Sequence, residues 1–219
     1  MAIQIIGFGG VVADVDDTVY RALKVVVQPV DYGLLGSYRM SVATGTINAT
    51  LTNGSVFQFY WPSATKIALV WGVLIDYGGS SANAGVQRFK LSVARLITAN
   101  GTGGSTISVP GTSEQSQQLR TSMRPSSVYP VLVSTTAALV DGTWMLDNNP
   151  VGAYTFAVDA SGTNQPVVQQ VLLYGSMSRR TSAPIVLDQN EALNLSLSTV
   201  TTPTFVVGIS IAWSETTYY

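Results

Sequence analysis

The side chains that most often carry out chemistry in proteins are scarce in this chain of 219 residues. Histidine and cysteine are both absent, which removes imidazole and thiolate metal sites, cysteine nucleophiles and triads with a histidine base. Catalysis would therefore fall to carboxylates, as in glycosidases, where two of them flank the sugar bond. The candidates are scattered, mostly at the ends of expected strands: Asp76, Glu114, Asp141, Asp147, Asp159, Asp188, Glu191 and Glu215. This scatter predicts solvated charges, no catalytic residues and a protein that is not an enzyme.

Two short segments share part of the pattern of a ligand-binding loop. The run from Asp14 to Asp17 holds three carboxylates that could bind Ca²⁺, but it lacks the Gly and the distal Glu of an EF-hand loop. The glycine-rich run from Gly101 to Gly104 is followed by neither Lys-Ser/Thr nor an expected helix, as a phosphate-binding loop would be. We interpret both segments as turns. The sequence therefore predicts no metal site and no cofactor.

The tryptophans are candidates for a binding platform. Trp61, Trp71, Trp144 and Trp213 could stack on sugar rings. However, Trp61 and Trp213 share strand faces with residues typical of a core, which favours a structural role for these two. The platform stays open as an alternative for the other two.

The surface chemistry of the chain indicates assembly. Only 11% of the residues are charged, whereas an average soluble domain has roughly 25%. Such a surface suits a subunit that buries much of its exterior against copies of itself or a partner, although a Ser/Thr-rich β monomer is the alternative. The net charge of -1 gives no general electrostatic case for binding nucleic acid or an anionic membrane. No apolar run approaches the roughly 18 residues of a membrane helix, so we expect no membrane partner.

Three places in the chain supply candidate interface residues. The apolar N-terminal segment has no obvious strand partner nearby, so we expect it to pair with a sheet edge of another subunit. The arginine doublet lies in an expected loop, where its guanidinium groups could meet carboxylates of a partner, with a merely solvent-exposed loop as the alternative. The candidates are Ile3, Ile5, Ile6, Phe8, Val11 and Val12 in the N-terminal segment, Arg179 and Arg180 in the loop, and Tyr218 and Tyr219 at the end.

Alternation of apolar and polar residues predicts strands along most of the chain, because successive side chains of a strand point to opposite faces. The clearest example places Phe205, Val207, Ile209, Ile211 and Trp213 on one face, with small residues between them. Similar alternation occurs in the segments 22–27, 56–61 and 193–198. Two long strands are expected at 67–77 and 86–97, separated by Gly78-Gly79-Ser80-Ser81.

Turn chemistry adds two local predictions. Asn53-Gly54 is typical of a type I′ hairpin, which needs positive φ at both residues. The segment Ser113–Ser122 could form a short helix.

Many short strands without interleaved helices indicate a sandwich or barrel. We therefore predict an all-β chain with one antiparallel, jelly-roll-like β-sandwich domain over residues 20–219, preceded by an arm or edge strand over residues 1–19.

Several segments together resemble a family of proteins from tailed-phage genomes. They are Gln28–Tyr38, Phe57–Trp61, Gln118–Met123, Ala138–Asp147 and Ile209–Glu215. The likeness runs from about Ala13 to Glu215, and it departs from the family where Tyr60 stands in place of a basic residue. The family has no catalytic signature, so the resemblance assigns no active-site residue.

The resemblance implies a β-sandwich protein of the virion. We expect a capsid cement, or decoration, protein that binds the outside of the major capsid protein shell, after synthesis in the host cytoplasm. Placement in a tail, fibre or spike that binds host glycan is the alternative. A homo-oligomer is expected, with a trimer favoured over a dimer because capsids offer local three-fold positions.

Overall fold

The computed structural model describes residues 5–6, 12–13, 15–16, 22–23, 36–79, 85–99, 101–107, 116–118, 126, 131–147, 149–158, 167–175, 183–199 and 204–217. The chain divides into two units, Met1–Tyr32 and Gly33–Tyr219. All the regular elements of the described residues are strands, which confirms the prediction of an all-β chain. The expected boundary after residue 19 stays a prediction.

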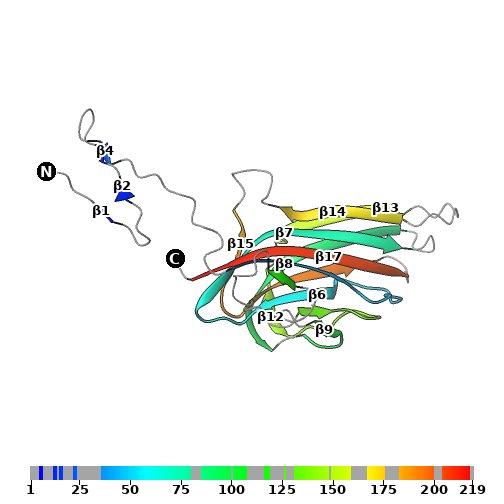
Figure 1. Ribbon diagram of the computed structural model, residues 1–219. Helices are drawn as coiled ribbons and strands as arrows, with labels where there is room; N and C mark the ends of the chain where they lie inside the picture. Colours follow the sequence, from blue (N-terminus) through cyan, green and yellow to red (C-terminus); the bar gives the residue numbers. More distant parts are fainter. Residues whose placement is uncertain are drawn as a thin grey trace. The chain divides into compact units, whose positions relative to one another are not determined.

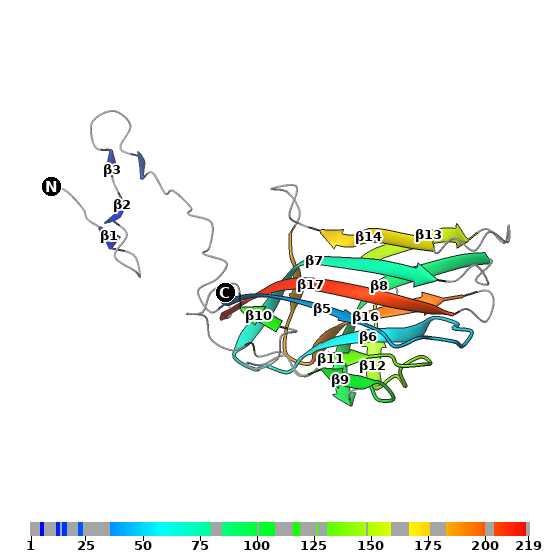
Figure 2. The ribbon, with the colours of Figure 1, turned by 45° about the vertical axis from the view of Figure 1, so that its right-hand side comes forward.

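Two antiparallel sheets form the larger unit, and they lie face to face in Figures 1 and 2. The first has the order β10 (Ser116–Gln118), β5 (Gly36–Ala43), β17 (Phe205–Thr217), β7 (Lys66–Gly79) and β14 (Val167–Gly175), and β15 (Ile185–Leu187) also pairs with β7. The second has the order β12 (Thr143–Leu146), β8 (Gly85–Ala99), β16 (Glu191–Ser198), β6 (Gly54–Trp61), β11 (Val131–Val133) and β9 (Ser105–Ile107), and β13 (Gly152–Val158) also pairs with β8.

The order of the long strands identifies the topology as a jelly roll. The described strands of seven or more residues are β5, β6, β7, β8, β13, β14, β16 and β17. Numbered 1 to 8 along the chain, they form one sheet in the order 1-8-3-6 and another in the order 2-7-4-5. This is the arrangement of two interlocked Greek keys that defines a jelly roll. The predicted fold class is therefore confirmed.

Aromatic side chains hold the two sheets together at both ends of the core. Trp213 of β17 stacks on Tyr38 of β5 at 5.4 Å between ring centroids, and it meets Phe59 of the opposite sheet edge-on at 5.1 Å. Toward the other end, Tyr77 of β7 contacts Phe89 of the opposite sheet at 6.1 Å. All of these side chains are at most 1% exposed. The core role expected for Trp213 is confirmed, and Trp61 is likewise fully buried.

The hairpin predicted at Asn53-Gly54 is wrong. Asn53 has a φ of 52°, but Gly54 has no positive φ, and the flanking strands β5 and β6 lie in different sheets. Asn53 Oδ1 instead accepts hydrogen bonds from Ser198 Oγ at 2.9 Å and Lys90 Nζ at 3.0 Å. A Cβ added at Gly54 would lie 2.8 Å from that of Ala138, so glycine is needed here for close packing. The segment with Asn53 and Gly54 therefore belongs to the connection that leads the chain from β5 in one sheet to β6 in the other.

The short helix suggested at Ser113–Ser122 is also wrong where the structure describes it. Residues Ser116–Gln118 form β10, which pairs antiparallel with β5 through Ser116 and Met40. Polar residues without clear periodicity left the segment ambiguous in the sequence. The hydrogen-bonding edge of β5 decides its conformation.

The smaller unit contains two short antiparallel pairs. Strand β1 (Ile5–Ile6) pairs with β2 (Val12–Ala13), and β3 (Val15–Asp16) pairs with β4 (Ala22–Leu23). The expectation that the apolar N-terminal segment has no strand partner nearby is therefore wrong. Each of these paired strands still has a second edge for hydrogen bonds.

Candidate interaction surface

The outer face of β5, β17, β7 and β14 carries mostly small side chains, and we call it the smooth face. Its residues alternate with the core residues of the same strands, so they point away from the second sheet. Three rows cross the four strands in register: Arg39, Ala212, Gly72 and Gly175, then Ser41, Ser210, Leu74 and Leu172, then Ala43, Gly208, Asp76 and Gln170. The two charged residues among these three rows are Arg39 and Asp76.

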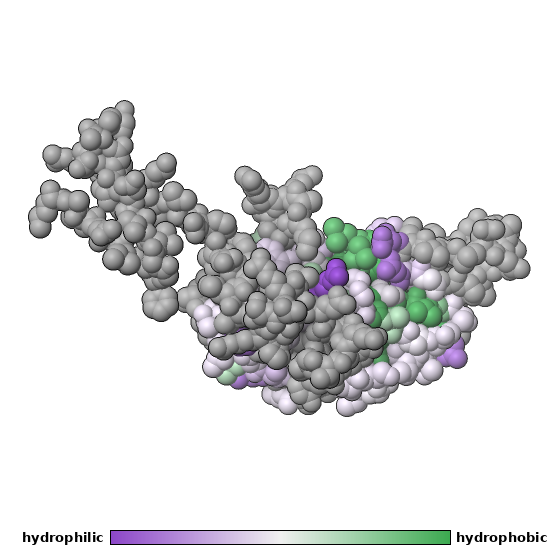
Figure 3. Space-filling model, viewed as in Figure 1, coloured by the Kyte–Doolittle hydropathy of each residue, from purple (hydrophilic) through white to green (hydrophobic). Residues whose placement is uncertain are grey.

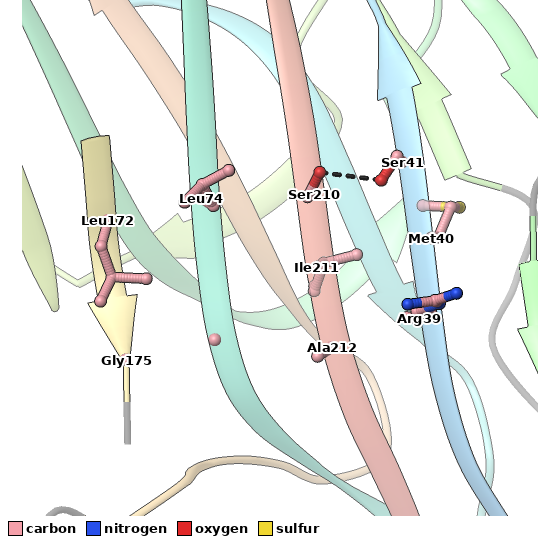
Figure 4. Close-up of a pocket in the computed structure, with 10 residues that line it drawn as sticks. Arg39, Met40, Ser41, Leu74, Leu172, Gly175, Ser210, Ile211 and Ala212 are labelled. Atoms are coloured by element: carbon pink, nitrogen blue, oxygen red, sulfur yellow. Dashed lines mark hydrogen bonds between the residues drawn. The ribbon is translucent and has the colours of Figure 1, made fainter. Parts of the chain in front are cut away.

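A shallow groove of about 390 Å³ runs over the first two rows. Figure 4 shows Arg39 and Ser41 on one side of it, Leu172 on the other, and the residues of β17 between them. Ser41 and Ser210 are joined by a hydrogen bond of 2.8 Å between their hydroxyl groups. A Cβ added at Gly72 would meet only Tyr174 O at 3.6 Å, which is an ordinary contact. Packing within the chain therefore does not require a glycine at this position.

Apolar side chains of the first sheet are exposed in the part of the chain that the structure describes. Leu172 is 57% exposed, and Val206 and Val186 are 36% and 45% exposed on the same sheet. In Figure 3 hydrophobic residues, drawn in green, gather over β14, β7 and β17. An exposed apolar face with two charges is typical of a surface that another molecule covers.

The outer face of the second sheet is different, because the chain covers part of it and the rest carries charged side chains beside exposed apolar ones, such as Met145 and Val86. Trp144 and Tyr60 pack against Ala94 and Ala192 on this face. Arg88, Lys90 and Arg95 of β8 and the acidic residues Asp147 and Glu191 lie around this region. Among the described residues of the larger unit, most of the charged side chains therefore lie away from the smooth face.

A polar cluster is buried beneath this covering. Asn194 Nδ2 donates to Ser55 Oγ at 2.9 Å, and Ser55 Oγ donates to a carboxylate oxygen of Asp141. The backbone N–H of Gly101 donates to Gln58 Oε1 at 3.2 Å. Asn194 is 1% exposed, so its Asn-x-Ser pattern lies inside the folded unit. These contacts fasten the loops after β8 and β11 to the sheet.

Two of the candidate catalytic carboxylates meet at one arginine. Arg95 Nη1 donates to Glu191 Oε1 at 2.5 Å, and Arg95 Nε lies 3.4 Å from Asp147 Oδ2. The side chains of Arg95 and Asp147 are about half exposed, so these pairs contribute little to stability. Their geometry is that of a surface ion-pair network.

Another candidate carboxylate, Glu215, is buried inside the larger unit. It accepts hydrogen bonds from Lys66 Nζ at 3.2 Å and from Ser126 Oγ at 2.6 Å. Burial, and secondarily the charge of Glu215, raise the pKa of the Tyr38 phenol well above its ordinary value. The groove on the smooth face does not include these residues.

The three rows of the smooth face contain none of the sequence-based interface candidates. Ile5, Ile6 and Val12 are in strands of the smaller unit. The remaining candidates, Ile3, Phe8, Val11, Arg179, Arg180, Tyr218 and Tyr219, lie outside the described residues.

The smooth face itself could have been found from the sequence. Gly208, Ser210 and Ala212 alternate with core residues in the clearest strand, in positions where a solvent-facing strand usually carries charges.

Within the described residues, no group of three or more acidic side chains is placed to hold a metal ion. The same part of the chain contains no helix long and apolar enough to cross a membrane. Comparisons of the chain with protein-family models, with curated proteins and with solved structures gave no match.

Proposed function

We propose that this chain is a capsid cement protein of a tailed bacteriophage. It binds the outside of the major capsid protein shell and stabilises it, and it has no catalytic role. The observation that carries the proposal is the smooth face, a broad sheet surface whose three central rows hold only Arg39 and Asp76 as charged residues.

The physical argument concerns desolvation. A protein that strengthens a shell must bury large surfaces against neighbouring chains, and each unpaired charge buried there costs several kcal/mol. A surface of Gly, Ala, Ser and exposed leucine avoids most of this cost. The stiff double sheet beneath it resists shear between the subunits that it joins.

The fold and the sequence also support the proposal of a capsid cement protein. Jelly rolls recur in viral capsid proteins and in lectins, although fold alone does not determine function. The segments Gln28–Tyr38 and Ile209–Glu215 are among those that resemble proteins from tailed-phage genomes. In this proposal the N-terminal strands β1 and β2 add to a sheet edge of the shell by β-augmentation.

The decisive experiment locates the protein on phage particles by gold labelling and by reconstruction at subnanometre resolution. Regularly arrayed density outside the shell is the expected result. Label confined to the tail would overturn the cement assignment, and absence from purified particles would overturn the virion assignment as well.

A second experiment tests the N-terminal segment. Shells lacking the protein are incubated with the full chain or with a variant lacking residues 1–12, and bound protein is measured after sedimentation. We expect the variant to retain the β-sandwich, seen by circular dichroism, and to lose binding. Unchanged binding would assign the shell contact to the larger unit.

The groove favours one alternative function. Its volume of about 390 Å³, with Arg39 and the hydroxyl groups of Ser41 and Ser210 at its wall, lies within the size range of small-ligand sites. A tail or spike protein could use it to bind a sugar of the host surface. Retention of the chain on immobilised host polysaccharide, abolished by Ser210→Leu, would favour this function over the cement proposal.

A further inference from the structure

We infer that the shell presents an arginine side chain to Asp76 of the smooth face. The inference rests on the proposed function, because it takes the shell as the molecule that covers this face. It adds the chemistry of the group that the shell supplies there, and it identifies Asp76 as the residue that determines which surface is accepted.

Asp76 is a carboxylate that the described part of the chain leaves without a partner. None of the ion pairs and hydrogen bonds of these residues includes its side chain. Arg39, the other charged residue of the three rows, already interacts within its own chain, so it does not need a partner from outside. A molecule that covers the smooth face therefore desolvates one unpaired carboxylate, which is unfavourable unless that molecule brings a cation.

Two glycines leave the carboxylate of Asp76 open to an approaching group. Gly208 lies beside it on β17, and a Cβ added there would lie 3.6 Å from Asp76 Oδ2. A Cβ added at Gly78, two residues along β7, would meet only Val206 O at 4.0 Å, so that side of the carboxylate is free space. Neither glycine has a positive φ, so the backbone does not require glycine at these positions.

Exposed apolar side chains lie at two opposite corners around Asp76. Leu172 is one row before it on β14, and Val206 is one row beyond it on β17. With strands about 4.8 Å apart and rows about 6.8 Å apart, the Cα atom of each lies about 8 Å from that of Asp76. A charged group between apolar side chains is typical of an interaction hot spot, in which the surrounding contacts exclude water from the central pair.

Arginine fits this setting better than lysine does. Its planar guanidinium group donates two parallel hydrogen bonds to one carboxylate, and it is more weakly hydrated than an ammonium group. Its aliphatic stem packs along apolar side chains while the charged end reaches further. One arginine side chain therefore pairs with Asp76 and covers Leu172 or Val206 at the same time.

Binding to shells that lack the protein tests the inference with the full chain. Sedimented protein is measured over a range of concentrations for the unmodified chain and for Asp76→Asn, which keeps the size of the side chain and removes its charge. The variant should bind about 30-fold or more weakly, because the arginine of the shell would be buried without its carboxylate. Asp147→Asn makes the same chemical change beside β12 of the second sheet, and it should bind as the unmodified chain does.

Gly78→Leu tests access to the carboxylate while its charge is kept. The added side chain occupies the free space beside Asp76, so binding should fall as it does for Asp76→Asn. Circular dichroism should show that all three variants retain the β-sandwich.

Chemical modification of the shells identifies the group on the other side. Shells treated with phenylglyoxal, which reacts with guanidinium groups, should no longer bind the unmodified chain. Shells treated after the chain has bound should keep it, because the guanidinium group is then covered. Loss of binding after acetylation of the shell lysines, with phenylglyoxal having no effect, would overturn the assignment to arginine.

The outcomes separate this inference from the cement proposal. Equal binding by the unmodified chain and by folded Asp76→Asn would overturn the inference and leave the cement proposal in place. Failure of the unmodified chain to bind shells would overturn both.

Discussion

Glu215 and Lys66 form an ion pair of 3.2 Å in which the carboxylate side chain has no exposed surface and the lysine side chain is 20% exposed. The two partners therefore differ in what happens when the other is removed. Lysine can turn its ammonium group toward water, whereas the carboxylate has no such path. This difference gives the first prediction.

Lys66→Met should destabilise the protein more than Glu215→Gln. The methionine variant leaves a buried carboxylate without its cation, which costs about 3–5 kcal/mol. The glutamine variant keeps an acceptor for Ser126 Oγ and should cost about 1–3 kcal/mol. Urea unfolding monitored by tryptophan fluorescence gives both values. Arg95→Gln, in the exposed ion-pair network, is the control and should cost less than about 1 kcal/mol; equal losses in the first two variants would contradict the argument.

Alkaline pH should destabilise the protein through Tyr38. Burial and the charge of Glu215 raise the pKa of this phenol in the folded state, whereas in the unfolded chain it titrates near pH 10. The stabilising contribution of the neutral phenol is therefore complete below about pH 10, and it is lost as the pH rises toward the folded-state value. Free energies of unfolding measured from pH 8 to 11 should fall, and the fall should be shallower in Tyr38→Phe.

A control for this experiment is Tyr60→Phe, which changes a tyrosine at the surface of the other sheet. Its hydroxyl group donates to Asn190 Oδ1 at 2.7 Å, so the variant shows how the pH profile responds to the loss of a tyrosine hydroxyl group outside the core. Parallel pH profiles for the Tyr38→Phe variant and the unmodified protein would exclude Tyr38 as the source of the alkaline loss.

Asn53→Ala should destabilise the protein by about 1–2 kcal/mol, because alanine is strained in the left-handed conformation of this residue. It also loses the side-chain hydrogen bonds to Ser198 and Lys90. Asn53→Gly removes the same bonds without the backbone strain, so it should cost less. Thermal unfolding ranks the two variants, with Asn48→Ala, at an exposed position without positive φ, as the control. A glycine variant that is less stable than the alanine variant would contradict this account.

Trp61→Phe should cost more than Trp213→Phe, although both tryptophans are buried. Trp61 Nε1 donates to Lys66 O at 2.7 Å, so its loss leaves a carbonyl group without that partner, at a cost of about 1–3 kcal/mol. Trp213 Nε1 is buried without a hydrogen-bond partner, so phenylalanine removes an unsatisfied group there. Chemical denaturation of the two variants measures the difference, and the reverse order would show that the cavity at Trp213 dominates.

The sequence predicted the fold correctly where the alternation of residues along one strand is enough to determine which of its faces is buried. In β17 the alternation of Phe205 to Trp213 with small residues corresponds to a buried and an outer face, as predicted. In β16 the same alternation places Asn194 on the face opposite the core leucines, and the loops that carry Gly101 and Asp141 cover this face. Which loop lies over which face depends on the three-dimensional order of the strands. Alternation within one strand does not contain that information.

The smooth face, too, could be predicted in part from single strands and in part not. The scarcity of charge led to the prediction of a surface for assembly, which stays a prediction, whereas the residues of the smooth face could be recognised in the sequence between the core positions of β17. Their arrangement into rows could not be recognised in this way, because it depends on the register between β5, β17, β7 and β14. Arg39 and Asp76 are far apart in the sequence, and only this register places them on the same face on either side of β17.

The position of the last two long strands has a consequence for biosynthesis. β16 and β17 follow all the other described strands along the chain, yet each lies in the middle of its sheet, between β8 and β6 and between β7 and β5. While a ribosome is still making residues 191–217, four long strands carry open hydrogen-bonding edges that have no partner. Such edges pair readily with other chains, so the nascent protein passes through an aggregation-prone interval before its final strands close both sheets. Slow translation of this last segment should therefore lower the yield of folded protein, even though the finished jelly roll is unchanged.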